Sequence, residues 1–338
     1  MIFELHTAFP QGLAEEWNDL LDRSITKVPF LRYEYLSGWW DTRGGGEWPQ
    51  AELRLVTARQ DGRLVGAAAL MQARHEGQPA LMLVGSIEIS DYLDLVVEEP
   101  NLPAFADGLL AFLRSPAFPG GWERLSLYNI PDDSPSLAAL QAAARRAGAV
   151  ISAEAESPCP YITLPGDWES YLAGIDKKQR HEIRRKIRRA ESAEQPVKLY
   201  VSSAPERIEQ DIEDCMRLMA VDAEKERFLT PAMRVQFKNC LSRAFEGGYL
   251  QLAFLEVGGE KAAVYANFLF NRRVLVYNSG MDTAFSEVSP GWVLLGYLLQ
   301  GAIEQGMQEF DFMRGNEDYK YRFGAVDRQV LRVEIQFA

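Results

Sequence analysis

Two β-hairpins constrain the fold of this chain most strongly. In the first, two apolar runs at residues 53–58 and 64–70 flank an Asp61-Gly62 turn. In the second, runs at residues 250–257 and 262–270 flank Gly258-Gly259. Turn pairs of this kind between apolar runs are typical of antiparallel hairpins. The sequence therefore predicts antiparallel sheet in both halves of the chain.

Helical patterns alternate with these strands. Residues 102–113 and 134–147 in the first half, and 205–224, 231–246 and 290–305 in the second, carry apolar side chains at helical spacing. The order of elements is similar in the two halves, although their sequence identity is too low to prove a duplication. We predict an α/β (α+β) fold of two similar domains, residues 1–155 and 156–338, each with a mixed, mostly antiparallel sheet flanked by helices.

Composition and charge narrow the class of protein. The chain has 338 residues, 47% of them hydrophobic, and a formal net charge of −12, which disfavours nucleic acid as a partner. The N-terminus lacks the pattern of a signal peptide and no apolar run is long enough to span a membrane, so a cytoplasmic location is expected. Cys159, Cys215 and Cys240 lack metal-site spacing, so we expect buried, reduced thiols and no metal.

The stretch from Phe310 to Gly324 is the first candidate for chemistry. It begins as a strand and then gathers charges of both signs behind Gly315. Lys320 could polarise a carbonyl oxygen, with Tyr319 and Arg314 beside it, and Asp311 or Glu317 could accept a proton. The alternative is a solvated loop or an internal network of ion pairs.

A second candidate is the start of the helix at residues 290–305. Ser289 suits an N-cap, Pro290 suits the first turn, and Gly291 allows a ligand close to the backbone. Free N–H groups at such a start, which includes Trp292 and Val293, attract phosphate. The alternative is an ordinary capped helix.

Basic residues crowd a third segment, the predicted helix at residues 176–192. Arg180, Arg184 and Arg188 lie on one stripe of the helix. They could bind a phosphate-bearing substrate, RNA or an anionic membrane surface, or they could be solvated cations that balance an acidic protein. Among these partners a small-molecule or envelope-precursor substrate is the expectation, a membrane contact would be weak, and the sequence does not indicate an oligomeric state.

A fourth candidate is Asp91-Tyr92-Leu93-Asp94, which places two carboxylates around a tyrosine at the start of a predicted strand. Asp91, Tyr92 and Asp94 could contact substrate, or they could cap a surface loop.

With these segments in view, the chain resembles the GNAT-like acyltransferases called CelD or BcsL, which are linked to cellulose and exopolysaccharide production. It resembles the Fem-type aminoacyltransferases more distantly. The matching residues are Ser289-Pro290-Gly291, Phe310-Asp311-Phe312 with Arg314-Gly315, Tyr319-Lys320, and the basic run up to Arg189. The resemblance spans most of the chain.

The resemblance implies a tandem pair of GNAT folds, with an acyl-CoA donor, acetyl-CoA above all, held by the helix start at Ser289–Val293. It further implies direct transfer of the acyl group to an amine or hydroxyl of a sugar, a cell-envelope precursor or a small metabolite. The usual GNAT phosphate loop is not intact here, since residues 285–291 retain only its late glycine. A Fem-type transferase that uses aminoacyl-tRNA and a non-catalytic binding module are therefore the alternatives.

Overall fold

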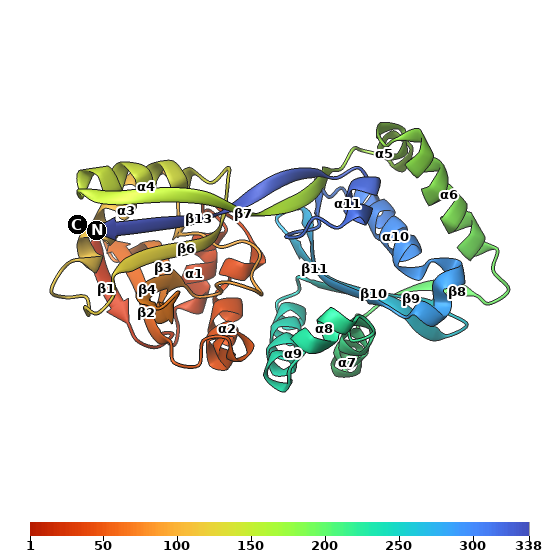
Figure 1. Cartoon of the computed structure of the whole chain (residues 1–338), viewed down its shortest axis with the longest axis horizontal. Helices are drawn as coiled ribbons and strands as arrows, with labels where there is room; N and C mark the ends of the chain where they lie inside the picture. Colours follow the sequence, from red (N-terminus) through yellow and green to blue (C-terminus); the bar gives the residue numbers. More distant parts are fainter. Residues whose placement is uncertain (338) are drawn as a thin grey trace. The chain divides into compact units, whose positions relative to one another are not determined.

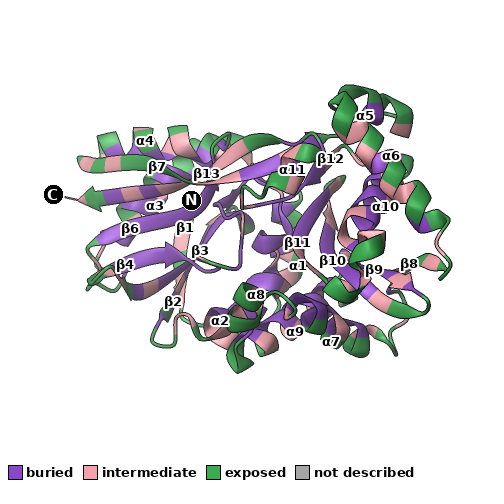
Figure 2. Ribbon diagram, turned by 45° about the vertical axis from the view of Figure 1, so that its right-hand side comes forward, coloured by how far each residue is buried: buried purple, intermediate pink, exposed green. Residues whose placement is uncertain are grey.

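The computed structural model describes residues 1–337 and forms two compact units (Figure 1). The first unit holds residues 1–157 and the chain from Gln329 onward, and the second holds residues 158–328. In each unit helices flank a mostly antiparallel sheet, as predicted for the fold class. The sheets are largely buried, while the outer surfaces of the helices are exposed (Figure 2).

The sheet of the first unit follows the order β1-β2-β3-β4-β6-β13, in which only β4 and β6 are parallel neighbours. The predicted hairpin is present as β2 (Glu52–Gln60) and β3 (Arg63–His75), and its turn residues Asp61 and Gly62 both have positive φ. The other elements are β1 (Ile2–His6), β4 (Gln78–Leu83), β5 (Val96–Val97), β6 (Arg124–Pro131), α1 (Ala14–Leu21), α2 (Tyr33–Gly46), α3 (Leu102–Leu113), α4 (Pro135–Arg146) and the short helices η1 (Pro29–Leu31) and η2 (Glu99–Asn101).

The second unit contains the order β7-β12-β11-β10-β9-β8, where β11 and β12 are the parallel pair. One face of this sheet carries α10 with α6 outside it, and the other carries α7 and α9 (Figure 1). The strands are β7 (Ala149–Thr163), β8 (Val197–Val201), β9 (Leu250–Val257), β10 (Glu260–Phe270), β11 (Arg273–Met281) and β12 (Glu309–Asp311). The helices are α5 (Trp168–Gly174), α6 (Lys177–Glu191), α7 (Ile208–Met219), α8 (Ala223–Phe228), α9 (Pro231–Glu246), η3 (Thr283–Val288), α10 (Pro290–Glu304) and α11 (Asp318–Arg322).

The division into units differs in one place from the predicted domains, which assigned the whole C-terminus to the second. The last strand, β13 (Val326–Phe337), pairs antiparallel with β6 through Val330–Gln336. Its side chains Val330, Val333 and Ile335 are buried. Hydrophobic burial against β6 thus places the end of the chain in the first unit.

Local structure also departs from prediction in three places. Residues 205–224, predicted as one helix, end as α7 and restart as α8, because Asp222 accepts hydrogen bonds from the N–H groups of Glu224 and Lys225 at 2.9 and 3.0 Å. Of the strand predicted at residues 92–97, only β5 is present. The charged loop predicted after residue 315 contains α11, a helix too short to show a periodic pattern.

Candidate functional site

The site begins where β11 and β12 separate. These strands pair over only three residues each, Arg273–Leu275 and Glu309–Asp311. Beyond this point β11 continues along β10 to Met281. The chain after β12 instead follows β7, with the N–H of Phe312 bonded to the Pro160 carbonyl at 2.9 Å and that of Gly315 to the Pro158 carbonyl at 3.0 Å. The two strands therefore diverge at their carboxyl ends.

A pocket of about 530 Å³ lies beyond this divergence, and we name it the β11–α10 pocket. Its walls come from the end of α7, the start of α8, β10, the end of β11, the start of α10, one residue of α6, and α11. Most of the wall is apolar, and its charged members are two lysines and two aspartates. The lining residues are Lys186, Leu218, Val221, Asp222, Lys225, Tyr265, Ser279, Gly280, Met281, Asp282, Thr283, Ser286, Ser289, Pro290, Gly291, Trp292, Leu295, Tyr319 and Phe323.

The start of α10, which the sequence predicts to hold the donor, lines the pocket but offers few N–H donors. Ser289 has left-handed backbone angles (φ 53°, ψ 57°) and its side chain makes no capping bond, because side-chain capping requires an extended residue. Its carbonyl accepts the N–H groups of Trp292 and Val293, both at 3.1 Å. Pro290 has no N–H, so within residues 1–337 Gly291 is the first-turn residue whose N–H has no backbone acceptor. Val293 is buried behind the pocket wall.

Two tyrosines meet on the wall of the pocket. Tyr265 of β10 and Tyr319 of α11 both line it, and their hydroxyls are hydrogen-bonded to each other. Burial raises the pKa of both hydroxyls well above their usual range. Both phenols therefore remain protonated at neutral pH. The Tyr265 hydroxyl donates to Tyr319, which leaves the proton of Tyr319 free to be donated into the pocket. Tyr319 was predicted from the sequence, whereas Tyr265 was not.

Lys320 lies behind this wall rather than on it. Its side chain is 3% exposed, and its ammonium donates to the Arg314 and Gly315 carbonyls at 3.1 and 3.0 Å and contacts the Glu317 carboxylate at 2.9 Å. These contacts close the turn in which Met313 and Gly315 have positive φ, at 55° and 111°. The geometry holds Lys320 as the support of the turn, and its catalytic role stays a prediction.

The other predicted catalytic residues surround Lys320 and do not line the pocket. Asp311 is fully buried and accepts the N–H of Met313 at 2.7 Å. Arg314 is partly exposed. Burial pushes the pKa of Glu317 up, but the hydrogen bond and charge of Lys320 outweigh it and hold the pKa below its usual range. The structure thus brings these residues together in sequence order around one turn, with Tyr319 at the pocket.

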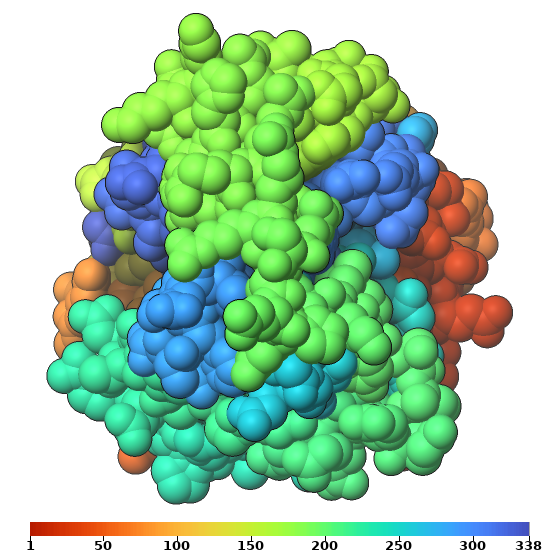
Figure 3. Space-filling view, turned by 90° about the vertical axis from the view of Figure 1, so that its right-hand side faces the viewer, coloured from red at the N-terminus to blue at the C-terminus, as the bar shows by residue number. Residues whose placement is uncertain are grey.

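The basic helix α6 contributes one residue to the pocket, and it is not a predicted one. Arg180 donates to the carbonyls of Leu172 and Ala173 at the end of α5, and Arg184 pairs with Glu169. The segment that contains α6 lies on the face seen in Figure 3, and Arg188 is exposed. Lys186 instead lines the pocket, 4.2 Å above the Trp292 ring. The sequence could have pointed to Lys186, because it lies three residues after Ile183 and thus on the apolar stripe of the helix.

The predicted substrate residues of the first unit have structural partners. Asp94 is buried, and it accepts hydrogen bonds from the hydroxyls of Thr26 and Ser134 and from the N–H of Leu95. Burial raises the pKa of its carboxyl, against the effect of these bonds. Tyr92 is also buried, and Asp91 is partly exposed. Contact of these residues with a substrate stays a prediction.

Neither a cluster of metal ligands nor a disulfide is present in the part of the chain that the structure describes. Among residues 1–337, no group of three or more His, Cys, Asp or Glu side chains could hold a metal ion. The three cysteines are buried and form no disulfide within residues 1–337, as predicted, and burial raises the pKa of the Cys215 and Cys240 thiols to about 12. No helix in these residues has the length and apolarity needed to cross a bilayer.

Comparisons with known proteins agree with this geometry. Residues 177–321 match the family model "Acetyltransferase (GNAT) domain". The chain is similar to the crystal structure of FemX, with a TM-score of 0.68 and 12% identity over 98% of this chain and 97% of that one. L-PGS from Bacillus licheniformis is similar with a TM-score of 0.59 and 12% identity over 98% and 93%. A conserved protein of unknown function from Bacteroides thetaiotaomicron is similar with a TM-score of 0.64 and 13% identity over 99% and 100%.

No curated protein sequence matches the chain. The structural similarities, at 12–13% identity, are evidence of fold, and the match to the family model covers all residues that line the β11–α10 pocket except Phe323. The resemblance to the CelD or BcsL group stays a prediction. Residues 177–321 match an acetyltransferase (GNAT) domain, which supports an acyltransferase, in a chain of two units that each carry a mostly antiparallel sheet flanked by helices.

Proposed function

We propose that the β11–α10 pocket transfers an acyl group from a thioester, acetyl-CoA, to an amine or hydroxyl acceptor by direct attack. The observation that carries this proposal is the pocket itself. It lies where two parallel strands diverge and a helix begins, and all its lining residues except Phe323 fall within the stretch that matches the acetyltransferase domain. An acceptor from the cell envelope, in cellulose or exopolysaccharide production, is the part of the proposal that rests on resemblance alone.

The start of α10 is the proposed place of the donor. The N–H of Gly291 is free for an acceptor atom, and the Trp292 Nε1 is buried without a partner in residues 1–337. A buried donor without a partner costs about 1–3 kcal/mol, so an oxygen of the thioester arm would relieve it. The apolar side chains Met281, Leu295 and Phe323 can cover the arm. Bound there, the donor supplies an activated acyl carbon.

The chemistry that remains for the protein is orientation and proton transfer. Holding donor and acceptor together can lower the barrier by about 7–11 kcal/mol, more than the two to four decades of rate that one acid or base supplies. When the acceptor forms its bond to the acyl carbon and the carbon–sulfur bond breaks, the leaving thiolate needs a proton. Tyr319 is the proposed proton donor to the thiolate, with Tyr265 holding its hydroxyl. The acceptor gives up its proton to solvent, and Tyr319 is reprotonated from solvent, so the proton count balances.

A donor titration tests the proposal. Purified protein is titrated by calorimetry with acetyl-CoA, with free CoA and with a charged tRNA. We expect saturable binding of acetyl-CoA, weakened by Gly291→Val, which fills the approach to the free N–H, and unchanged by Gly301→Ala, which lies three turns along α10. Binding of charged tRNA alone would support the Fem-type alternative, and binding of neither donor would leave a non-catalytic module.

A further inference from the structure

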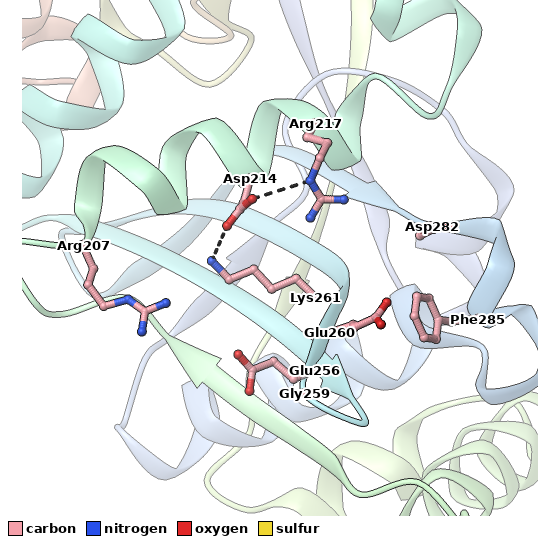
Figure 4. A pocket seen from close by; sticks show the side chains of 9 residues that line it. All are labelled: Arg207, Asp214, Arg217, Glu256, Gly259, Glu260, Lys261, Asp282 and Phe285. Atoms are coloured by element: carbon pink, nitrogen blue, oxygen red, sulfur yellow. Dashed lines mark hydrogen bonds and ion pairs between the residues drawn. The ribbon is translucent and has the colours of Figure 1, made fainter.

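Lys261 and Lys320 of the second unit have ammonium groups that are withdrawn from solvent and paired with carboxylates. Lys261 contacts Asp211 at 2.5 Å and Asp214 at 2.8 Å, and Figure 4 shows it turned toward Asp214 between Arg207 and Arg217. Lys320 contacts Glu317 and two backbone carbonyls. A buried cation requires such partners, because its desolvation is costly.

Lys225 is a third lysine of this unit, and its charge has no partner of opposite sign. Its ammonium donates to the carbonyl of Ser279 at 2.5 Å, and among residues 1–337 it forms no salt bridge. Two carboxylates act on it electrostatically without forming a salt bridge to it: Asp222 accepts the N–H groups that start α8, and Glu317 pairs with Lys320. Burial lowers the pKa of Lys225, which is the physical sign of an uncompensated charge.

The surroundings of Lys225 define what could compensate this charge. Lys225, Leu218 and Val221 line the β11–α10 pocket at the α7–α8 end, while the start of α10 lines it from the helix on the other face of the sheet (Figure 1). Asp282, the second aspartate of the wall, accepts the N–H of Ala284 at 2.8 Å. The acidic groups of the wall thus accept backbone N–H groups, and of its two lysines Lys186 lies 3.7 Å from the Glu182 carboxylate. Lys225 is therefore the wall lysine available to an anionic ligand.

We propose that Lys225 binds the anionic group of the acceptor, so the acceptor is an amine or alcohol that also carries a carboxylate or a phosphate. This inference rests on the proposed function, which assigns the α10 end to the donor and leaves the α7–α8 end to the acceptor. An acceptor of this class pairs its anion with the Lys225 ammonium and lays its apolar part against Leu218 and Val221.

Two matched pairs of probes test the inference by calorimetry. One pair is 6-aminohexanoate and 6-aminohexanamide, which differ by a carboxylate, and the other is glucosamine 6-phosphate and glucosamine, which differ by a phosphate. In at least one pair we expect the anionic member to bind about tenfold more tightly, as one charge-assisted bond provides. Equal binding within both pairs overturns the proposal.

Variants assign the preference to its residue. Lys225→Met should abolish it and Lys225→Arg should keep it, with the melting temperature of each variant as the check on folding. Lys178→Met is the matched control, because Lys178 is exposed on α6 and does not line the pocket. A preference that survives in Lys225→Met shows that another cation binds the anion and overturns the assignment.

A separate arm distinguishes this inference from the proposed function. The anionic probe that binds more tightly is titrated with and without saturating acetyl-CoA. Undiminished binding supports an acceptor site, whereas competition shows that the anion belongs to the donor and overturns the inference. Failure of acetyl-CoA itself to bind contradicts the proposed function, and the probe pairs measured without donor still decide the role of Lys225.

Discussion

Tyr319 is the residue on which the proposed proton transfer depends. Tyr319→Phe removes the hydroxyl and keeps the ring that packs beside Phe312 at 6.0 Å between centroids. We expect turnover, measured as thiol release with 6-aminohexanoate or glucosamine 6-phosphate as acceptor, to fall by about 10²-fold or more, with acetyl-CoA binding unchanged. Because burial raises the pKa of Tyr319, the phenol stays protonated as the pH rises, so wild-type turnover should not decline up to pH ~9.5.

Tyr321→Phe is the matched control for that prediction. Tyr321 lies on the same helix, donates to Asp327 at 2.9 Å and does not line the pocket. Its hydroxyl should be dispensable for turnover. Equal losses in the two variants would mean that the effect comes from disturbing α11, and full activity of Tyr319→Phe would remove the tyrosine from the mechanism.

Lys320 gives a prediction of stability at the same scale. Lys320→Met leaves the carbonyls of Arg314 and Gly315 without their donor and Glu317 without its cation. We expect the free energy of unfolding to fall by about 2–3 kcal/mol, measured by urea denaturation. On the same helix, Arg322→Met breaks only an exposed pair with Asp318 and should cost less than about 1 kcal/mol.

The catalytic role that the sequence predicts for Lys320 makes a different prediction. If the ammonium stabilises negative charge on the acyl oxygen, removing it lowers turnover by about 10²–10³-fold and leaves stability unchanged. Measuring both quantities on the one variant separates a support of the 313–315 turn from a catalytic cation.

At the scale of elements, the contact between α7 and β11 shapes the pocket and depends on a glycine. A Cβ at Gly280 would lie 2.5 Å from the backbone of both Leu218 and Met219. Backbone atoms cannot swing aside, so Gly280→Ala should separate helix from strand and cost about 1–3 kcal/mol in a urea denaturation. The same variant should weaken acetyl-CoA binding, since Leu218 and Gly280 both line the pocket.

A second glycine supplies the control of opposite sign. Gly301 lies inside α10, where the nearest atom to an added Cβ is the Gln305 side chain at 3.9 Å. Alanine fits there and restricts the unfolded chain, so Gly301→Ala should stabilise by about 0.5–1 kcal/mol. A destabilising Gly301→Ala, or a neutral Gly280→Ala, would contradict the packing described.

The elements also show which parts of the architecture could be predicted from sequence. The hairpin at Asp61-Gly62 was predictable because its signal is local, as turn residues between apolar runs. So was the start of α10 at Pro290. The short helices α8 and α11 were not, because five or six residues carry no helical period. Because α8 was not predicted, Lys225 was not recognised as a pocket residue. Because α11 was not predicted, Tyr319 was assigned to a charged loop.

The candidate site was predictable only in part for a related reason. Sequence composition places Lys320 among charges, but it cannot tell whether the ammonium points outward or back to the carbonyls of residues 314 and 315. Tyr265 and Tyr319 are far apart in the sequence, and their hydroxyls meet only because the sheet places β10 beside the pocket. A sequence pattern does not show such a long-range contact. Lys186 was hidden by the more conspicuous arginines around it on α6.

At the scale of the whole molecule, the path of the chain between the two units decides which residues make up each unit. β7 starts in the first unit and ends in the second, and β13 returns from the second unit to the first. The second unit is therefore one continuous segment, residues 158–328, whereas the first unit is closed by residues from both ends of the chain. The two units should differ in their response to loss of the C-terminus.

Ending the chain after Arg328 tests this difference. All residues of β6 are buried, and the truncation removes its partner strand with Val330, Val333 and Ile335. Burial of each such side chain stabilises by about 1.5–3 kcal/mol, so the loss is comparable to the entire stability of a domain, about 5–15 kcal/mol. We expect the first unit to become sensitive to protease while a fragment near residues 158–328 survives, as identified by mass spectrometry.

A chain ended after Ile335 keeps most of the pairing and should resist protease throughout. Equal resistance of both truncated chains would show that β13 does not hold the first unit together.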